Sequence, residues 1–106
     1  MILIDKNDIG TVSTDQFIKQ KMSCLKQLNF ELSFDLILDC TKALLPIEDL
    51  IELQSLLKKK SRLLVLILPH DEIDILPIEF NIAPTLVEAN DFISFERMQR
   101  DLGFQY

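Results

Sequence analysis

The chain has 106 residues, of which 48% are hydrophobic and 26% charged, and it carries a formal net charge of −6 at pH 7. This balance excludes a wholly disordered chain, and the length favours one domain with its own core. The net negative charge repels phosphate backbones and anionic lipid surfaces, so we expect neither a nucleic acid nor a membrane as a direct partner.

The first part of the chain predicts a β-hairpin followed by a helix. Two β-type segments within residues 1–13 flank the turn formers Asp5-Lys6-Asn7-Asp8. Ser13 and Gln16 have the spacing of a capping box, which predicts a helix over residues 15–28. The apolar residues expected on its inner side are Phe17, Ile18, Met22, Leu25 and Leu28.

The middle of the chain predicts a βαβ unit. Residues 34–39 and 63–68 are short, nearly continuous apolar runs, which are typical of strands buried on both faces. A helical pattern over residues 46–59 lies between them. We therefore expect parallel pairing of the two strands and a right-handed crossover.

Both ends of the helix over residues 46–59 are marked in the sequence. Pro46 suits the first turn, and Glu48, Asp49 and Glu52 complement the positive end of the helix dipole. The cations of Lys58-Lys59-Lys60 and Arg62 are expected to complement its negative end. The residues available for packing are Ile47, Leu50, Ile51, Leu53 and Leu57.

The last part of the chain predicts a short helix over residues 71–76, a short edge strand over residues 80–83 and a helix over residues 86–102. Thr85 and Glu88 form the capping box of the last helix. Its expected inner residues are Leu86, Ala89, Phe92, Ile93, Met98 and Leu102. The order of elements predicts a single α/β domain spanning all 106 residues, with a mixed, partly parallel sheet and helices mainly on one face.

No targeting or membrane-spanning segment is recognised. The longest apolar run, residues 63–68, has six residues, whereas a spanning helix needs roughly 20. Met1-Ile2-Leu3-Ile4-Asp5 has no basic region and only four apolar residues, unlike a secretory signal. We therefore expect a cytoplasmic protein.

The sequence offers few residues for catalysis. His70 is the only histidine, which excludes a multi-histidine metal centre and leaves no local Ser-His or Cys-His pattern. Gly10 and Gly103 cannot form a glycine-rich phosphate loop. Cys24 and Cys40 are isolated and are expected to be buried, apolar and reduced. We expect no enzymatic activity and no cofactor.

Carboxylates follow both of the strands that are expected to be buried. They are Asp39, Glu48, Asp49 and Glu52 after the first strand, and Asp71, Glu72 and Asp74 after the second. Because parallel strands end at the same edge of a sheet, the two groups could together hold Mg²⁺. Carboxylates at helix starts more often serve as caps and dipole partners, so we expect no metal site.

Leu36-Ile37-Leu38-Asp39-Cys40-Thr41 is an apolar strand that ends in Asp-x-Thr, followed by the helix from Pro46 and the apolar run of residues 63–68. These features resemble the STAS family, small domains typified by bacterial anti-sigma factor antagonists and the cytoplasmic tails of sulfate transporters. Residues 1–103 can be placed on that topology. The resemblance implies a STAS-like fold and a non-catalytic, regulatory role in binding another protein.

The chain departs from the family at the start of the helix. Phosphorylatable members carry a serine or threonine there, whereas this chain has Ile47-Glu48-Asp49-Leu50, with two carboxylates and no hydroxyl. We therefore expect no phosphorylation switch at this position. The acidic pair could instead hold the surface in a permanently phosphate-like state.

The end of the chain resembles a group of small bacterial proteins that are sometimes labelled ribonuclease Z. The matching residues are Pro84-Thr85-Leu86-Val87-Glu88-Ala89, Asp91-Phe92-Ile93, and Glu96 with Arg100-Asp101-Leu102-Gly103-Phe104. That enzyme resembles metallo-β-lactamases and needs an HxHxDH cluster, which a single histidine cannot supply. The label would then mark a partner or neighbour of the nuclease.

Three functions remain open. The first is an interaction module that binds a protein with a basic surface through the face around Thr41, Leu44, Glu48, Asp49 and Glu52. The second is an accessory of RNA processing. The third is a self-associating structural protein, a homodimer formed through an exposed edge strand or through apolar residues of the last helix, with Phe95 and Phe104 included.

Overall fold

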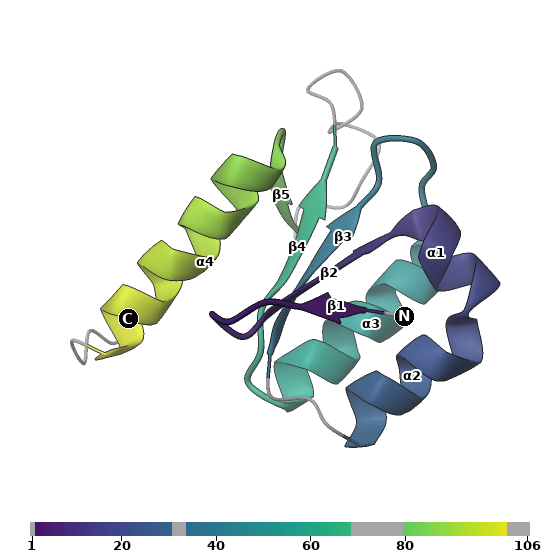
Figure 1. Ribbon diagram of the computed structural model, residues 1–106, viewed down its shortest axis with the longest axis horizontal. Coiled ribbons are helices and arrows are strands. Elements are labelled where there is room, and N and C mark those ends of the chain that lie inside the picture. The colour runs from purple at the N-terminus through teal and green to yellow at the C-terminus, as the bar shows by residue number, and fades with distance from the viewer. Residues whose placement is uncertain (1, 31–33, 69–79, 102–106) are drawn as a thin grey trace.

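A computed structural model describes residues 2–30, 34–68 and 80–101, which form one mixed sheet with helices on both of its faces (Figure 1). The strands lie side by side in chain order and are β1 (Leu3–Ile4), β2 (Ile9–Ser13), β3 (Asp35–Asp39), β4 (Leu64–Ile67) and β5 (Asn81–Ala83). β1 is antiparallel to β2, and the other three pairings are parallel. The predicted α/β class is confirmed, and so is the parallel pairing of the two buried strands.

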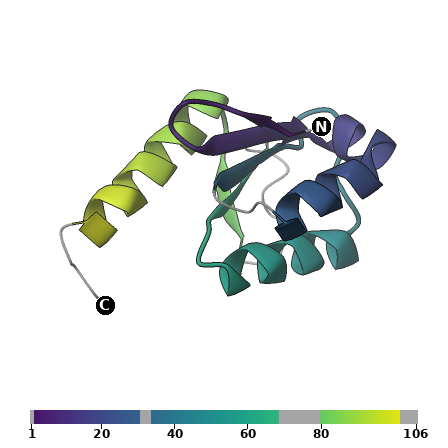
Figure 2. The same ribbon diagram turned by 60° about the horizontal axis from the view of Figure 1, so that its bottom comes forward.

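Within the described residues, three helices cover one face of the sheet and a fourth covers the other (Figure 2). They are α1 (Thr14–Lys19), α2 (Lys21–Phe30), α3 (Ile47–Lys59) and α4 (Leu86–Asp101). The core under α1, α2 and α3 is separate from the smaller core under α4. Helices therefore lie mainly on one face, as predicted.

Side chains of β3 alternate between the two cores. Leu36 and Leu38 belong to the core under α1, α2 and α3, whereas Ile37 belongs to the core under α4. All three side chains are buried. Because both faces of β3 are covered, its sequence is a continuous apolar run instead of an alternating one.

β2 requires a glycine at position 10. A Cβ atom on Gly10 would lie 2.7 Å from Cγ2 of Ile2 and 2.7 Å from Cδ2 of Phe34. Carbon atoms pack best at about 3.5–4.0 Å, so a side chain would collide with both residues. The absence of one lets Ile2 and Phe34 pack directly over β2 as part of the larger core.

The helix predicted over residues 15–28 is wrong in one respect, because the structure has two helices there. Ser13 caps α1 as predicted, and its Oγ accepts a hydrogen bond from Gln16 N at 3.1 Å. α1 ends at Lys19, and the backbone of the C-cap residue Gln20 leaves the helical region with φ −120° and ψ 36°. α2 begins at the next residue.

This bend affects which side chains of α1 and α2 are buried. Phe17, Cys24 and Leu28 fill the core-facing stripe of the two helices. The expected burial of Ile18 and Met22 is wrong, because both side chains lie outside this stripe and are exposed. The expected burial of both cysteines is confirmed.

Four further side chains are more exposed than predicted. They are Ile47 and Ile51 of α3, and Leu86 and Met98 of α4. The side chains that these helices bury are Leu50, Leu53 and Leu57 of α3, and Ala89 and Ile93 of α4. A helix packed on a sheet buries one stripe, and the apolar positions beside that stripe remain in solvent.

The backbone just before β1 is hydrogen-bonded to a side chain from α2. Oε1 of Gln27 accepts a hydrogen bond from Ile2 N at 3.2 Å, and Nε2 of Gln27 donates one to Ile2 O at 3.2 Å. Gln27 thus pairs with the backbone of Ile2 as a neighbouring strand would. The edge is therefore occupied at the residue that leads into β1.

A buried ion pair ties α4 to the sheet. Asp35, at the start of β3, has no exposed surface. Its Oδ2 lies 2.7 Å from Nη2 and 2.8 Å from Nε of Arg97 in α4, and its Oδ1 accepts a hydrogen bond from Leu63 N at 2.8 Å. Arg97 also donates to the backbone carbonyls of Asn7 and Asp8 in the hairpin turn. One side chain therefore connects α4, β3 and the hairpin.

Some predicted features lie outside the described residues. They are the short helix over residues 71–76, His70, Asp71, Glu72, Asp74, Leu102, Gly103 and Phe104. The edge strand predicted over residues 80–83 is β5. Within the described ranges, no helix combines the length and hydropathy needed to cross a bilayer.

Candidate functional site

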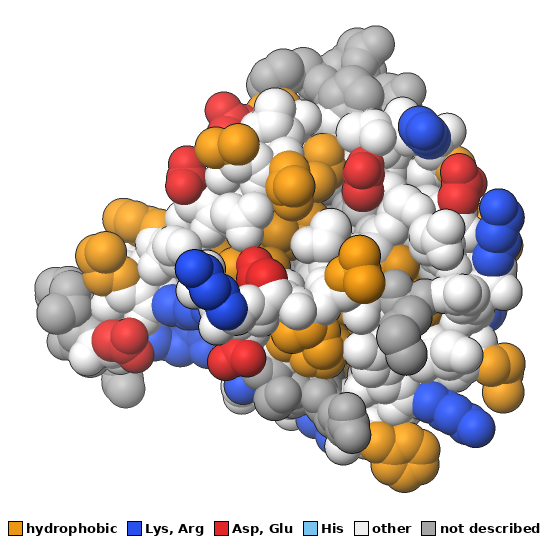
Figure 3. Space-filling model, in the orientation of Figure 1, with side chains coloured by type: hydrophobic (Ala, Val, Ile, Leu, Met, Phe, Trp, Pro, Cys, Tyr) orange, Lys and Arg blue, Asp and Glu red, His pale blue; other side chains and the backbone are white. Residues whose placement is uncertain are grey.

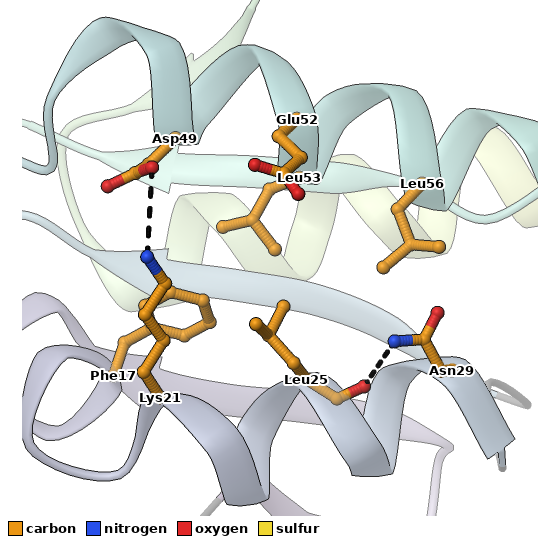
Figure 4. Close-up of a pocket in the computed structure, with 8 residues that line it drawn as sticks. All are labelled: Phe17, Lys21, Leu25, Asn29, Asp49, Glu52, Leu53 and Leu56. Carbon is orange, nitrogen blue, oxygen red and sulfur yellow. Dashed lines mark hydrogen bonds and ion pairs between the residues drawn. The ribbon is translucent and has the colours of Figure 1, made fainter.

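A groove lies between α2 and α3 on the face of the sheet that carries three helices (Figure 4). Its volume is about 180 Å³. The apolar side chains in its lining are Phe17, Leu25, Leu53 and Leu56, and the polar ones are Lys21, Asn29, Asp49 and Glu52. In the close-up, the leucines of the two helices point toward one another across the groove.

The polar side chains form a rim around this apolar floor. Nζ of Lys21 lies 3.9 Å from Oδ1 of Asp49, with the two side chains 52% and 31% exposed. Nδ2 of Asn29 donates a hydrogen bond to the carbonyl of Leu25 at 2.9 Å. Glu52 has no ion pair with any described residue. Of the two carboxylates at the rim, that of Asp49 is paired with a cation and that of Glu52 is paired with none among the described residues.

The structure divides the five residues of the predicted interaction face among three places. Asp49 and Glu52 line the groove, and Glu48 is exposed beside them in the first turn of α3. Leu44 is half-buried and packs against the larger core. Thr41 lies in a different cleft.

Sequence reasoning missed the part of the groove that α2 supplies. Lys21, Leu25 and Asn29 are four residues apart and line one side of the groove. The apolar stripe of residues 15–28 is the available signal, and it allows a partner groove, but packing on the sheet is the use that such a stripe favours. Only the placement of α2 beside α3 shows that Leu25 points toward Leu53 across the groove.

The second cleft lies where β2 and β3 end. It has a volume of about 270 Å³ and includes Ser13, Asp39, Thr41 and Lys42 in its lining. Oδ1 of Asp39 accepts hydrogen bonds from the backbone N of Thr41 at 3.0 Å and from its Oγ1 at 2.7 Å. This local turn explains the Asp-x-Thr sequence as the exit from β3.

Cys40, between these two residues, does not present a reactive thiolate. The side chain is buried, and burial raises the pKa of the thiol. A hydrogen bond from Thr14 Oγ1, with its oxygen 3.5 Å from Sγ, lowers this pKa, and the charge of Asp39 raises it. The net direction is upward, so the thiol stays protonated at neutral pH.

Arginines gather at the opposite edge of the sheet. Arg62, Arg97 and Arg100 line a cavity of about 290 Å³ together with Asp8 and Asp101. The charge of Arg97 is engaged by the buried carboxylate of Asp35, and Nη1 of Arg100 lies 3.4 Å from the carbonyl of Ser61. Lys58 and Lys59 lie in the last turn of α3, as the dipole interpretation expects.

Among the described residues, no group of three or more histidine, cysteine or acidic side chains is placed to hold a metal ion. Comparisons with protein-family models, curated proteins and solved structures found no match for the chain. A function must therefore be inferred from the geometry of the chain itself.

Proposed function

We propose that the chain is a non-catalytic cytoplasmic module that binds another protein through the groove between α2 and α3 and the acidic first turns of α3. The observation that carries the proposal is the combination of an apolar floor with an acidic rim. Leu25, Leu53 and Leu56 supply the floor, and Glu52 is exposed at its border. Glu48 is exposed one turn before Glu52 on the same helix. Protein interfaces have this anatomy, an apolar centre inside a polar rim.

The proposal includes a STAS-type architecture. What supports it is the order of elements around β3, which ends at Asp39 and is followed by Cys40 and Thr41, then by α3 and the parallel strand β4. The helix start after this strand carries Glu48 and Asp49 and no hydroxyl group. The module is therefore proposed to act without phosphorylation at that position.

The partner is proposed to present a basic surface. Lys21 compensates Asp49, so the uncompensated charges at the groove belong to Glu48 and Glu52. Charges at the border of an interface mainly set the association rate, its salt dependence and the choice of partner. Binding should therefore weaken as salt rises.

Affinity capture from the cell lysate tests the proposal. The tagged chain is compared with a Glu48→Lys, Asp49→Lys variant and with a control variant, Glu88→Lys, Asp91→Lys, which makes the same charge change on the exposed side of α4. We expect one protein to be captured by the original and the control, and to be lost with the α3 variant. Equal capture by all three chains would refute the assignment of the face.

Self-association is the competing function, and one observation favours it. Phe95 and Met98 of α4 are 57% and 58% exposed. In Figure 3, hydrophobic side chains are visible between α4 and the hairpin, among charged side chains of both signs. A mass that doubles with concentration, together with the recovery of only the chain itself from the lysate, would favour a homodimer over the interaction module.

A further inference from the structure

We infer that the groove between α2 and α3 takes one branched aliphatic side chain of the partner, with a cationic group beside it that pairs with Glu52. This inference rests on the proposed function, because it names the chemistry of the partner at the same site. The ligand class is a protein segment that carries a leucine-like side chain next to a lysine or arginine.

The size of the groove favours a side chain over a metabolite. Its volume is about 180 Å³. Pockets for small molecules and cofactors usually enclose about 300–1,000 Å³. A single aliphatic side chain is a better match in size, and an apolar anchor that fills a small pocket is a common centre of a protein interface.

The lining favours an aliphatic group at the floor. Leu25 reaches in from α2, and Leu53 and Leu56 reach in from α3, above the buried ring of Phe17. Polar groups are confined to the rim, where Asn29 already donates its amide hydrogen to the carbonyl of Leu25. A polar group placed on the floor would lose its water without gaining a hydrogen bond.

The rim favours a cation over an anion. Lys21 and Asp49 form an ion pair at one end of the groove. The carboxylate of Glu52 points toward the apolar floor and has no ion pair among the described residues. An incoming anion would be repelled by this charge. An incoming cation would compensate it, and repulsion from Lys21 would keep the cation at the Glu52 end.

Three small probes with the same branched apolar body test this assignment. They are isopentylguanidinium, isopentanol and 4-methylpentanoate, which are cationic, neutral and anionic. Each is titrated into the ¹⁵N-labelled full chain while amide chemical shifts are followed. We expect shifts at Leu25, Asn29, Leu53 and Leu56, with the cation binding about two- to fivefold tighter than the alcohol, as for a partly exposed ion pair. The anion 4-methylpentanoate should bind weakest.

Two variants and a control assign the effect to side chains. Glu52→Gln should remove the preference for the cation and leave binding of the alcohol unchanged. Leu56→Asn should weaken all three probes, because it places an amide on the floor. Glu88→Gln on α4 removes the same charge elsewhere and should change nothing. Equal binding of cation and alcohol to the original chain, or shifts that map away from α2 and α3, would overturn the inference.

The probes and the lysate experiment can fail independently. If a partner is captured and then lost with the Glu48 and Asp49 reversal, yet the probes show no preference for the cation, this inference fails and the proposed function stands. If the probes bind as expected and no partner is captured, the proposed function fails and the groove keeps its chemical assignment.

Discussion

Asp35 carries a full charge at a position with no exposed surface. Moving a carboxylate out of water is costly unless partners replace the lost hydration. Here the partners are the guanidinium of Arg97, with Nη2 2.7 Å from Oδ2, and the backbone N of Leu63, 2.8 Å from Oδ1. The pair therefore maintains the junction of β3 with α4, and either group alone would be destabilising.

Replacing Arg97 with methionine should lower the stability of the domain strongly. The change keeps a long apolar side chain but leaves Asp35 without its cation, and breaking a buried pair in this way costs about 3–5 kcal/mol. We expect the lower end of that range, because Arg97 is 28% exposed and Leu63 N remains as a donor. Urea unfolding measures the loss.

Arg100→Met is the matched control for this prediction. Arg100 lies on the same helix and is exposed, and its only described contact is a 3.4 Å hydrogen bond to Ser61 O. Its loss should change the free energy of unfolding by about 0.5 kcal/mol or less, as at ordinary surface positions. Equal effects of the two substitutions would show that the buried pair is not a major source of stability.

Cys40 should make stability depend on pH in the alkaline range. Burial raises its pKa in the folded chain, so the native state keeps the thiol proton at pH values where the unfolded state begins to lose it. The contribution is complete below about pH 8.5, the ordinary thiol value, and is lost as pH rises through the folded-state pKa.

Urea unfolding between pH 7 and pH 10 tests this statement. Stability of the original chain should fall with rising pH more steeply than that of a Cys40→Ala variant. The variant loses a buried sulfur and is less stable throughout, but the comparison concerns slopes, not absolute values. Parallel pH profiles for the two chains would contradict the role given to Cys40.

At the scale of single residues, the sequence hides the most important contacts. Asp35 lies within an apolar run and gives no sign of its partner, since Arg97 is 62 positions further along the chain. The Asp39 and Thr41 turn is different, because its hydrogen bonds span two residues and a short motif marks it. A short sequence motif can predict a hydrogen bond between near neighbours, but a contact between distant residues can be identified only from the folded structure.

The individual elements were largely predictable from caps and apolar runs. Ser13 marks the start of α1, and the runs that become β3 and β4 are too short and too apolar for helices. The bend at Gln20 was not predictable, since no proline or glycine marks it. The bend changes how the two helices lie against the sheet. α1 follows β2 directly, and α2 then reaches the backbone of Ile2 with Gln27.

Gln27 shows how α2 controls the edge of the sheet, and its replacement with leucine should loosen β1. The substitution removes two hydrogen bonds to Ile2. Each such bond contributes about 0.5–1.5 kcal/mol, so we expect a total loss of about 1–2 kcal/mol. Amide hydrogen exchange at Ile2 and urea unfolding measure the change.

Lys26→Leu is the control for the Gln27→Leu substitution. It adds the same side chain at the neighbouring exposed position of α2. Exchange at Ile2 should rise only in the Gln27 variant, and that variant should also associate more readily through its uncovered edge strand. Unchanged exchange at Ile2 would show that Gln27 does not protect β1.

The charged side chains of α3 are unevenly distributed along the helix. The first turns carry Glu48, Asp49 and Glu52, whereas the end of the helix carries Lys58 and Lys59. From the sequence alone this gradient is explained by the helix dipole. The structure adds α2 alongside, so that the acidic half also borders an apolar groove.

The candidate site was therefore predictable only in part. The acidic residues of the site could be predicted, because helix starts and strand ends can be recognised in the sequence. The apolar residues of the groove could not be predicted. Leu25 and Leu56 belong to two helices with β3 between them in the chain, and they line one groove only in the folded domain. Thr41 is close to the acidic residues in sequence, yet it lies in the other cleft.

Site-specific photocrosslinking in cells is the most direct test of the central claim, that this face of α3 binds another protein. A photoreactive residue replaces Ser55, which is exposed on α3 one turn after Glu52, and in a matched chain it replaces Ser94, which is exposed on α4. We expect a crosslink to one other protein from position 55 and none from position 94. A crosslink only between copies of the chain, or the same protein from both positions, would contradict the account.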